Sequence, residues 1–186
     1  MPSTELNKLF DTLSIQSFDT KNGEVLLKEF GAGGGTKLND FYLGGLTNKS
    51  FICKLDCKNK ISEYFNKSYP GVHKGCDYII YAEREDEKYI LFCELKSDNP
   101  KGFDKQIRNS MIFWDYVSSV LLHYANIDIS SSTRIPVLFS TSKSRKNRTS
   151  KLLKKEERND LLYIDAGNPL RINIDRIIQS FNSAQA

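Results

Sequence analysis

The chain lacks any apolar run longer than a few residues, so no segment is expected to span a bilayer or contact a membrane. Its N-terminus, MPSTELNKLFDTL, has no basic stretch followed by an apolar core, so no secretory signal is expected either. We therefore expect a cytoplasmic protein. There is no internal repeat and no long linker, and 186 residues fit a single domain spanning residues 1–186.

Cysteine is scarce, and its spacing is not that of a typical zinc site. The four cysteines are Cys53, Cys57, Cys76 and Cys93, and no CxxC pair occurs. Without an export signal, a disulfide framework is not expected. A four-cysteine zinc site stays an alternative. Because free cysteine is among the most buried residue types, we expect small buried thiols.

Two further absences limit the chemistry. The run GAGGGTK, Gly31 to Lys37, has neither a closing GKS or GKT nor a GxGxxG pattern. We interpret its Gly31–Gly35 part as a loop near a substrate rather than as a nucleotide site. Neither of the two histidines stands near a serine motif for acyl transfer. For His73, in a turn-rich segment, a structural role is favoured over contact with a phosphate.

Positive charge is concentrated in one segment. Between Lys143 and Arg158, eight basic residues oppose two glutamates, whereas the whole chain has a net charge of only +4. Lysine and arginine bind a phosphate backbone without reading its sequence, so this basic segment is a candidate nucleic-acid contact. A solvated loop running into a charged helix is the alternative. The candidate contacts are Lys143, Arg145, Lys146, Arg148 and Lys151.

The hydrophobic pattern predicts an α/β domain with a central mixed β-sheet flanked by helices. Helices are predicted at 4–13, in the second half of 48–67, from Pro100 to 125 and at IDRIIQSF, and strands at 76–82, 88–96, 134–140 and 160–164. Ser3 or Thr4 is the expected cap of the first helix, and Asp98 or Asn99 that of the long one.

The long helix is strongly apolar and is expected to pack against the sheet. Trp114 and Tyr116 lie within it, and we expect both in the core rather than as stacking platforms for bases. Residues 23–30 fit either a strand or a helix.

Two apolar strands joined by the charged tip EREDEK predict an antiparallel hairpin. Alternation on the second strand points Glu94 and Lys96 to one face and Leu95 to the other. Counting inward from a tip near Glu85–Glu87 brings Asp77 alongside Glu94 to Lys96. Three ionisable groups then converge at one end of an apolar sheet. A surface ion pair on an edge strand is the alternative.

These groups suit phosphodiester hydrolysis. Two neighbouring carboxylates repel each other, which raises their pKa unless a cation lies between them. Mg²⁺ or Mn²⁺ fits, because both prefer oxygen ligands and take one or two carboxylates together with water and a substrate phosphate. The metal lowers the pKa of bound water, and a lysine beside it stabilises the transition state.

The segment CDYIIYAEREDEKYILFCELK, followed by a helix carrying Gln106, resembles the PD-(D/E)XK nuclease superfamily. That family has an aspartate opening one strand, Glu-x-Lys on the next, and a helix that often bears a glutamine. Asp77, Glu94, Lys96 and Gln106 match these positions. The resemblance implies a restriction-endonuclease-like core of helix, three mixed strands, helix and strand. It also implies Asp77 and Glu94 as metal ligands, the carbonyl of Leu95 as a further ligand, and Lys96 as the catalytic cation.

The match covers the core motif at 76–106 and departs from the family pattern in one place, where Cys76 stands in the position of a proline. Many family members add an acidic residue from the preceding helix. Glu63 is the best-placed candidate for that catalytic role, and Glu29 is second.

The resemblance implies a Mg²⁺-dependent endonuclease, which we expect to act on DNA rather than RNA in a phage, mobile-element or defence context. One alternative is a non-catalytic domain of the same fold that binds nucleic acid or protein. Another is an effector domain that cleaves RNA. Many enzymes of this fold dimerise, so a homodimer stays open, as do base specificity and endonuclease versus exonuclease action.

Overall fold

The computed structural model describes residues 1–28, 41–55, 68–69, 71–96, 102–140, 153–156, 161–165 and 170–183. The glycine-rich run at 31–37, the helix expected in the second half of 48–67 and most of the basic segment lie outside these residues. Among the described residues, no helix combines the length and the apolar character that crossing a bilayer requires.

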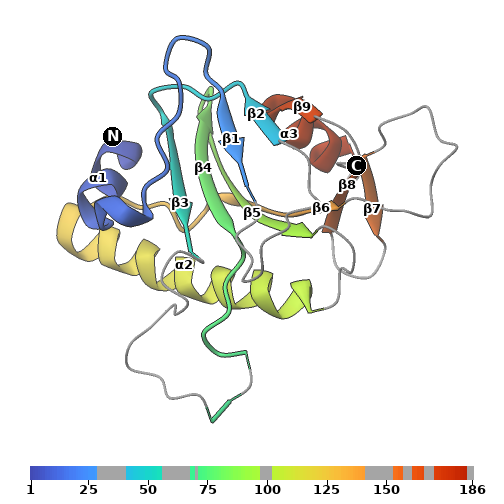
Figure 1. Cartoon of the computed structure of the whole chain (residues 1–186). Helices are drawn as coiled ribbons and strands as arrows, with labels where there is room; N and C mark the ends of the chain where they lie inside the picture. The colour runs from blue at the N-terminus through green and yellow to red at the C-terminus, as the bar shows by residue number, and fades with distance from the viewer. Residues whose placement is uncertain are drawn as a thin grey trace, which may run out of the picture.

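A six-stranded mixed sheet forms the centre of the fold (Figure 1). In spatial order its strands are β3 (Ser50–Lys54), β4 (Tyr78–Arg84), β5 (Glu87–Lys96), β6 (Thr133–Ser140), β8 (Leu161–Asp165) and β7 (Leu153–Glu156). Strands β3, β4 and β5 are antiparallel, β5, β6 and β8 are parallel, and β7 is antiparallel to β8. The predicted hairpin and the strands at 134–140 and 160–164 are confirmed.

One face of this sheet is covered by a smaller sheet and a helix. Strands β1 (Val25–Leu27), β2 (Phe41–Gly44) and β9 (Leu170–Asn173) form the smaller sheet, and α3 (Ile174–Ser183) follows β9. Their apolar side chains join alternate residues of β4, β5, β6 and β8 in one buried cluster. The sequence of residues 23–30 fitted either a strand or a helix, and in the structure Val25–Leu27 of this segment form strand β1.

The opposite face packs against the long helix α2 (Phe103–Ala125), which runs along the bottom of Figure 1. The helix α1 (Pro2–Leu9) and a short 3₁₀ turn, η1 (Thr12–Ser14), precede the sheet in sequence, and Leu6 of α1 is buried in the same cluster. The molecule therefore has three layers, and β5 lies in the middle of the central one.

The helix starts differ from the predicted ones. Helix α1 begins at Pro2, and Ser3 is a buried residue within it whose hydroxyl donates to the carbonyl of Asn48, so neither Ser3 nor Thr4 caps it. Helix α2 begins at Phe103 rather than at Pro100. Its N-cap is Gly102, whose φ of 82° is a left-handed conformation that glycine adopts without steric cost.

Two further predictions about side chains and elements need correction. Trp114 is fully buried, as expected, but Tyr116 is 68% exposed because it lies on the outer side of α2. Within the basic segment, Leu153–Glu156 form the edge strand β7 by pairing with β8, so this part is neither a loop nor the start of a charged helix.

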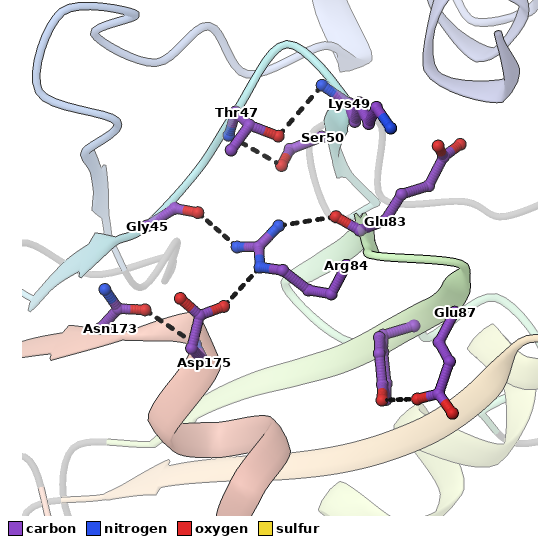
Figure 2. A network of polar contacts seen from close by, with 10 residues as sticks. Gly45, Thr47, Lys49, Ser50, Glu83, Arg84, Glu87, Asn173 and Asp175 are labelled. Atoms are coloured by element: carbon purple, nitrogen blue, oxygen red, sulfur yellow. Dashed lines mark hydrogen bonds and ion pairs between the residues drawn. The ribbon is translucent and has the colours of Figure 1, made fainter.

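Arg84, near the end of β4, connects the layers (Figure 2). Its guanidinium donates to Asp175 in the first turn of α3, to the carbonyl of Gly45 after β2, and to the carbonyl of Glu83. The side chain of Asn173 accepts from the backbone N–H of Asp175 and so holds the start of α3 in place. One side chain thus joins both sheets and α3.

Candidate active site

The strand register brings Asp77 beside Glu94. Tyr78 pairs with Cys93 across the β4–β5 ladder, and Asp77 and Glu94 are the next residues outward on the two strands. The backbone N–H of Leu95 donates to Asp77 Oδ2 at 2.6 Å. The carboxylate of Asp77, which is 5% exposed, is therefore fixed against the end of β5.

Lys96 completes the cluster on the same face. Its Nζ lies 2.5 Å from Glu94 Oε1. The Glu94 side chain has no exposed surface, whereas 23% of the Lys96 side chain is exposed. Because an isolated buried carboxylate is costly, the positive charge of Lys96 stabilises the buried Glu94 side chain. The alternative of a surface pair on an edge strand is wrong, since β5 is central.

The side chain of Leu95 is buried in the opposite core, among residues packed under the smaller sheet. Only the backbone of Leu95 can therefore contribute to the site, and its N–H donates a hydrogen bond to Asp77. The carbonyl of Leu95 as a metal ligand stays a prediction.

The donor atoms present are those that Mg²⁺ or Mn²⁺ prefers. Asp77 and Glu94 offer carboxylate oxygens side by side on two adjacent strands. Over the described ranges, no group of three or more histidine, cysteine, aspartate or glutamate side chains is placed to hold a metal ion. Two carboxylates nevertheless fit Mg²⁺, which commonly binds one or two of them and completes its shell with water and substrate phosphate.

The neighbouring thiols are electrically neutral parts of the core. Burial raises the pKa of Cys76 well above its usual range; a hydrogen bond with Ser110 opposes this and the charge of Glu94 adds to it. Burial also raises the pKa of Cys93, with Asp77 the next contributor. Burial raises the pKa of Tyr78 to about 12, and its hydroxyl bonds to the backbone of Lys28.

The cysteines do not gather into a zinc site in the described part of the chain. Cys53, Cys76 and Cys93 are buried free thiols, as expected, and Cys57 lies outside the described residues. Cys53 and Cys76 belong to the core under α2, whereas Cys93 faces the opposite core.

Gln106, on the first turns of α2, holds the chain segment that leads into the site. Its Nε2 donates to the carbonyl of Gly75 at 3.2 Å, two residues before Asp77. This contact makes Gln106 a positioning residue for Asp77 rather than a group turned toward a reacting atom.

Two side chains that the sequence did not single out act with Gln106. Ser110 Oγ accepts from the backbone N–H of Cys76 at 2.8 Å and donates to the carbonyl of Gln106. Asn109 Nδ2 donates to the carbonyls of Gly71 and Lys74, at 2.7 and 2.9 Å. The available signal was the helical spacing of Gln106, Asn109 and Ser110, three polar residues interrupting an apolar helix.

Ser140, the last residue of β6, is a further polar residue near the site that the sequence did not single out. Its backbone pairs in register with Lys96, and it is 3% exposed. A polar residue at the end of an apolar strand was the signal in the sequence.

His73 does not reach outward from its turn. Both ring nitrogens are buried, and neither has a hydrogen-bond partner in the part of the chain that the structure describes. A structural role is therefore the better fit than a phosphate contact.

A cavity of about 150 Å³ lies between α2 and strands β6 and β8. It is lined by Phe103, Asp104, Ile107, Arg108, Met111, Pro136 and Leu161. Neither the two carboxylates nor Lys96 lines it.

The remaining predicted site residues lie outside the described residues. They are Glu63, its alternative Glu29, and the basic residues Lys143, Arg145, Lys146, Arg148 and Lys151. Comparisons of the chain with protein-family models, curated proteins and solved structures find no match.

Proposed function

We propose that the chain is a metal-dependent nuclease that hydrolyses phosphodiester bonds, acting as an endonuclease on DNA. The observation that carries the proposal is that three ionisable residues, Asp77, Glu94 and Lys96, lie at the same end of two neighbouring strands in an otherwise apolar sheet. Asp77 is fixed by the N–H of Leu95, and Glu94 is fixed by Lys96, all within one hairpin. Buried charges in such a position are strong candidates for function.

The order of elements adds support. The PD-(D/E)XK resemblance implies a helix, three strands, a helix and a strand. Elements α1, β3, β4, β5, α2 and β6 occur in that order, with η1, β1 and β2 inserted between α1 and β3. In this arrangement Asp77 immediately precedes the second strand, and Glu94 and Lys96 lie at the end of the third.

In the proposed mechanism, Asp77 and Glu94 would hold Mg²⁺ or Mn²⁺, with the carbonyl of Leu95 as a further ligand, and such an ion would supply Lewis acidity at the phosphate. Lys96 places a positive charge at the partly exposed edge of the cluster, where it stabilises negative charge developing on the phosphate. Gln106 and Ser110 hold the backbone before Asp77, so that the carboxylate keeps its position.

The test is cleavage of supercoiled plasmid, linear duplex, single-stranded DNA and RNA with Mg²⁺ or Mn²⁺. The variants are Asp77→Asn, Glu94→Gln and Lys96→Met, which preserve shape while removing charge. Each variant removes a charge that we expect to act on the metal or the phosphate in the transition state. We therefore expect the cleavage rate to fall by about a hundredfold or more. EDTA should abolish it. The matched control is Glu87→Gln, which neutralises an exposed carboxylate at the other end of β5.

Folding of each variant is checked by thermal unfolding, so that lost activity is not confused with lost structure. Wild-type cleavage rates in folded Asp77→Asn or Lys96→Met would place the chemistry elsewhere. DNA binding without metal-dependent turnover on any substrate would favour the non-catalytic alternative. Cleavage confined to RNA would favour the effector alternative.

A further inference from the structure

Ser140 stands at the edge of the central sheet where the parallel strands end. Strands β5, β6 and β8 are parallel, and their last residues, Lys96, Ser140 and Asp165, pair in register. In sheets with parallel strands, ligands bind outside the carboxyl ends of those strands. Ser140 is therefore the residue beside Lys96 at the edge that a substrate of the candidate site would approach.

Ser140 also lies on the same face of the sheet as the candidate site. Along β6, Leu138 belongs to the core under α2, whereas Val137 and Phe139 belong to the core under the smaller sheet. This alternation places Ser140 on the α2 side, where the alternation along β5 also places Lys96. Because neighbouring strands are only about 4.8 Å apart, the two side chains start from adjacent positions.

The register of β5 and β6 gives the two members of the ion pair different neighbours. Leu138 pairs with Glu94, and Ser140 pairs with Lys96. The buried carboxylate therefore has an apolar residue beside it on β6, whereas Lys96, whose side chain is 23% exposed, has a residue with a hydroxyl beside it. A phosphate attracted to Lys96 would meet a hydrogen-bond donor on the neighbouring strand.

The hydroxyl of Ser140 is a buried donor that the described part of the chain does not use. Ser140 is 3% exposed, and no hydrogen bond joins its hydroxyl to another described residue. By contrast, the buried hydroxyls of Ser110 and Ser132 donate to the carbonyls of Gln106 and Ile129. Because a buried hydroxyl without a partner is costly, a ligand that brings an acceptor to Ser140 would be stabilised there.

We infer that Ser140 and Lys96 together bind the phosphate of the DNA substrate at which cleavage occurs. The Lys96 ammonium supplies the charge, and the Ser140 hydroxyl donates a hydrogen bond to a non-bridging oxygen of the same phosphate. This inference rests on the proposed function and adds to it a residue that orients the substrate beside Asp77 and Glu94. Because the contact is made to the backbone, binding through Ser140 is expected to be independent of base sequence.

The first test is the affinity of the full chain for a short fluorescent DNA duplex, measured by anisotropy with Ca²⁺ in place of Mg²⁺. Ser140→Ala removes the hydroxyl, and Ser140→Thr keeps it. The matched control is Ser118→Ala, because Ser118 also has a buried hydroxyl without a described partner. Ser118 lies about two turns of α2 beyond Ser110, which contacts Cys76 before the site. Gels verify that the duplex stays intact, and thermal unfolding verifies that each variant folds.

We expect Ser140→Ala to bind the duplex about tenfold more weakly, because hydrogen bonds to charged groups are stronger than those between neutral groups. Two duplexes of unrelated sequence should show the same loss. Ser140→Thr and Ser118→Ala should bind like the wild type, since both keep the hydroxyl at position 140.

The second test is cleavage of a duplex in which sulfur replaces one non-bridging oxygen of the phosphate at the cut, in each of the two stereochemical forms. Sulfur is a weak hydrogen-bond acceptor. In one form, sulfur should therefore slow the wild type about tenfold more than it slows Ser140→Ala. A serine that only supports the fold would leave the effect of sulfur equal in the two proteins.

Wild-type affinity in Ser140→Ala, an equal loss in Ser118→Ala, or equal sulfur effects in the two proteins would overturn the inference. If Ser140→Ala does not fold, Ser140→Cys takes its place, because it keeps the size of the side chain and has only a weak donor. An affinity that depends on Ser140 without cleavage by the wild type would contradict only the proposed function. Cleavage that requires Asp77, Glu94 and Lys96 but not Ser140 would contradict only this inference.

Discussion

At the scale of single residues, Glu94 and its neighbours set the electrostatics of the core. Glu94 has no exposed surface and is paired with Lys96, while Cys76 is buried in the core on the same side of the sheet and Cys93 in the core on the opposite side. Burial, with a smaller contribution from the charges of Asp77 and Glu94, raises the pKa of both thiols, so the native state keeps these thiol protons to a higher pH than the unfolded chain does.

This difference predicts that alkali weakens the fold. The unfolded thiols ionise near pH 8.5, and the folded ones ionise later, so the stabilisation is fully present below about pH 8.5 and is lost as pH rises toward the folded pKa. Each thiol contributes a slope of about 1.4 kcal/mol per pH unit to the free energy of unfolding. Urea unfolding between pH 8 and pH 10.5 measures that slope.

Cys93→Ala separates the two thiols. It should remove about half of the slope that the pair provides, whatever it does to the stability at pH 8. A slope identical to that of the wild type would mean that Cys93 does not keep its proton on folding.

At the scale of elements, two sides of helix α2 have different roles. Ile107, Trp114, Val117 and Leu121 pack against the sheet, while polar side chains at its beginning hold the turn before Asp77. Ser110 is the most buried of these polar residues and has no exposed surface.

Ser110→Ala is expected to cost about 1 to 3 kcal/mol in the free energy of unfolding, because it leaves the buried N–H of Cys76 without an acceptor. Ser119→Ala is a matched control, since Ser119 also donates to the carbonyl four residues earlier but is exposed and accepts no such bond. Urea unfolding of the two variants should differ by more than 1 kcal/mol. Equal effects would show that the bond to Cys76 is unimportant.

The elements that the sequence predicted are those whose pattern is local. The hairpin was readable because an apolar run, a charged tip and a second apolar run follow one another, and the alternation at Glu94 to Lys96 then placed the site. Strands β2 and β9 were missed because each has four residues, and their pairing joins Phe41 to Leu170 across the length of the chain. No local signal reports such a partner.

The helix starts and Tyr116 show a second limit. Asp98 and Asn99 are good caps in isolation, but Gly102 supplies a left-handed turn that starts α2 later. Tyr116 and Trp114 have similar local patterns, and only the side of α2 that meets the sheet decides which is buried. Gln106 was found by its position in a motif, whereas its bond to Gly75 depends on a turn that the pattern does not specify.

At the scale of the whole molecule, Arg84 joins the layer of the smaller sheet and α3 to the central sheet near the hairpin tip. The candidate site lies at the opposite end of the same strands, on the α2 side. The candidate site is thus separated from the contacts that attach the smaller sheet and α3 to the central sheet.

Arg84→Ala is therefore expected to loosen the smaller sheet without disturbing the site. Because its pair with Asp175 is partly exposed, the cost in unfolding free energy should be about 1 to 2 kcal/mol. Hydrogen exchange should accelerate in β2, β9 and α3 and stay unchanged in β5. Lys8→Ala is the control, since its exposed pair with Glu5 lies within one helix and should be worth less than about 0.5 kcal/mol. Faster exchange spread equally over all strands would contradict this division.

The alternation along β5 also restricts how this gene can change in length. Leu91, Cys93 and Leu95 face one core, and Phe92, Glu94 and Lys96 face the other side of the sheet. Losing or gaining a single codon between Tyr89 and Cys93 would turn the carboxylate and the ammonium into the apolar core and bring a leucine to the site. Insertions and deletions in this strand can therefore be tolerated only in pairs of codons.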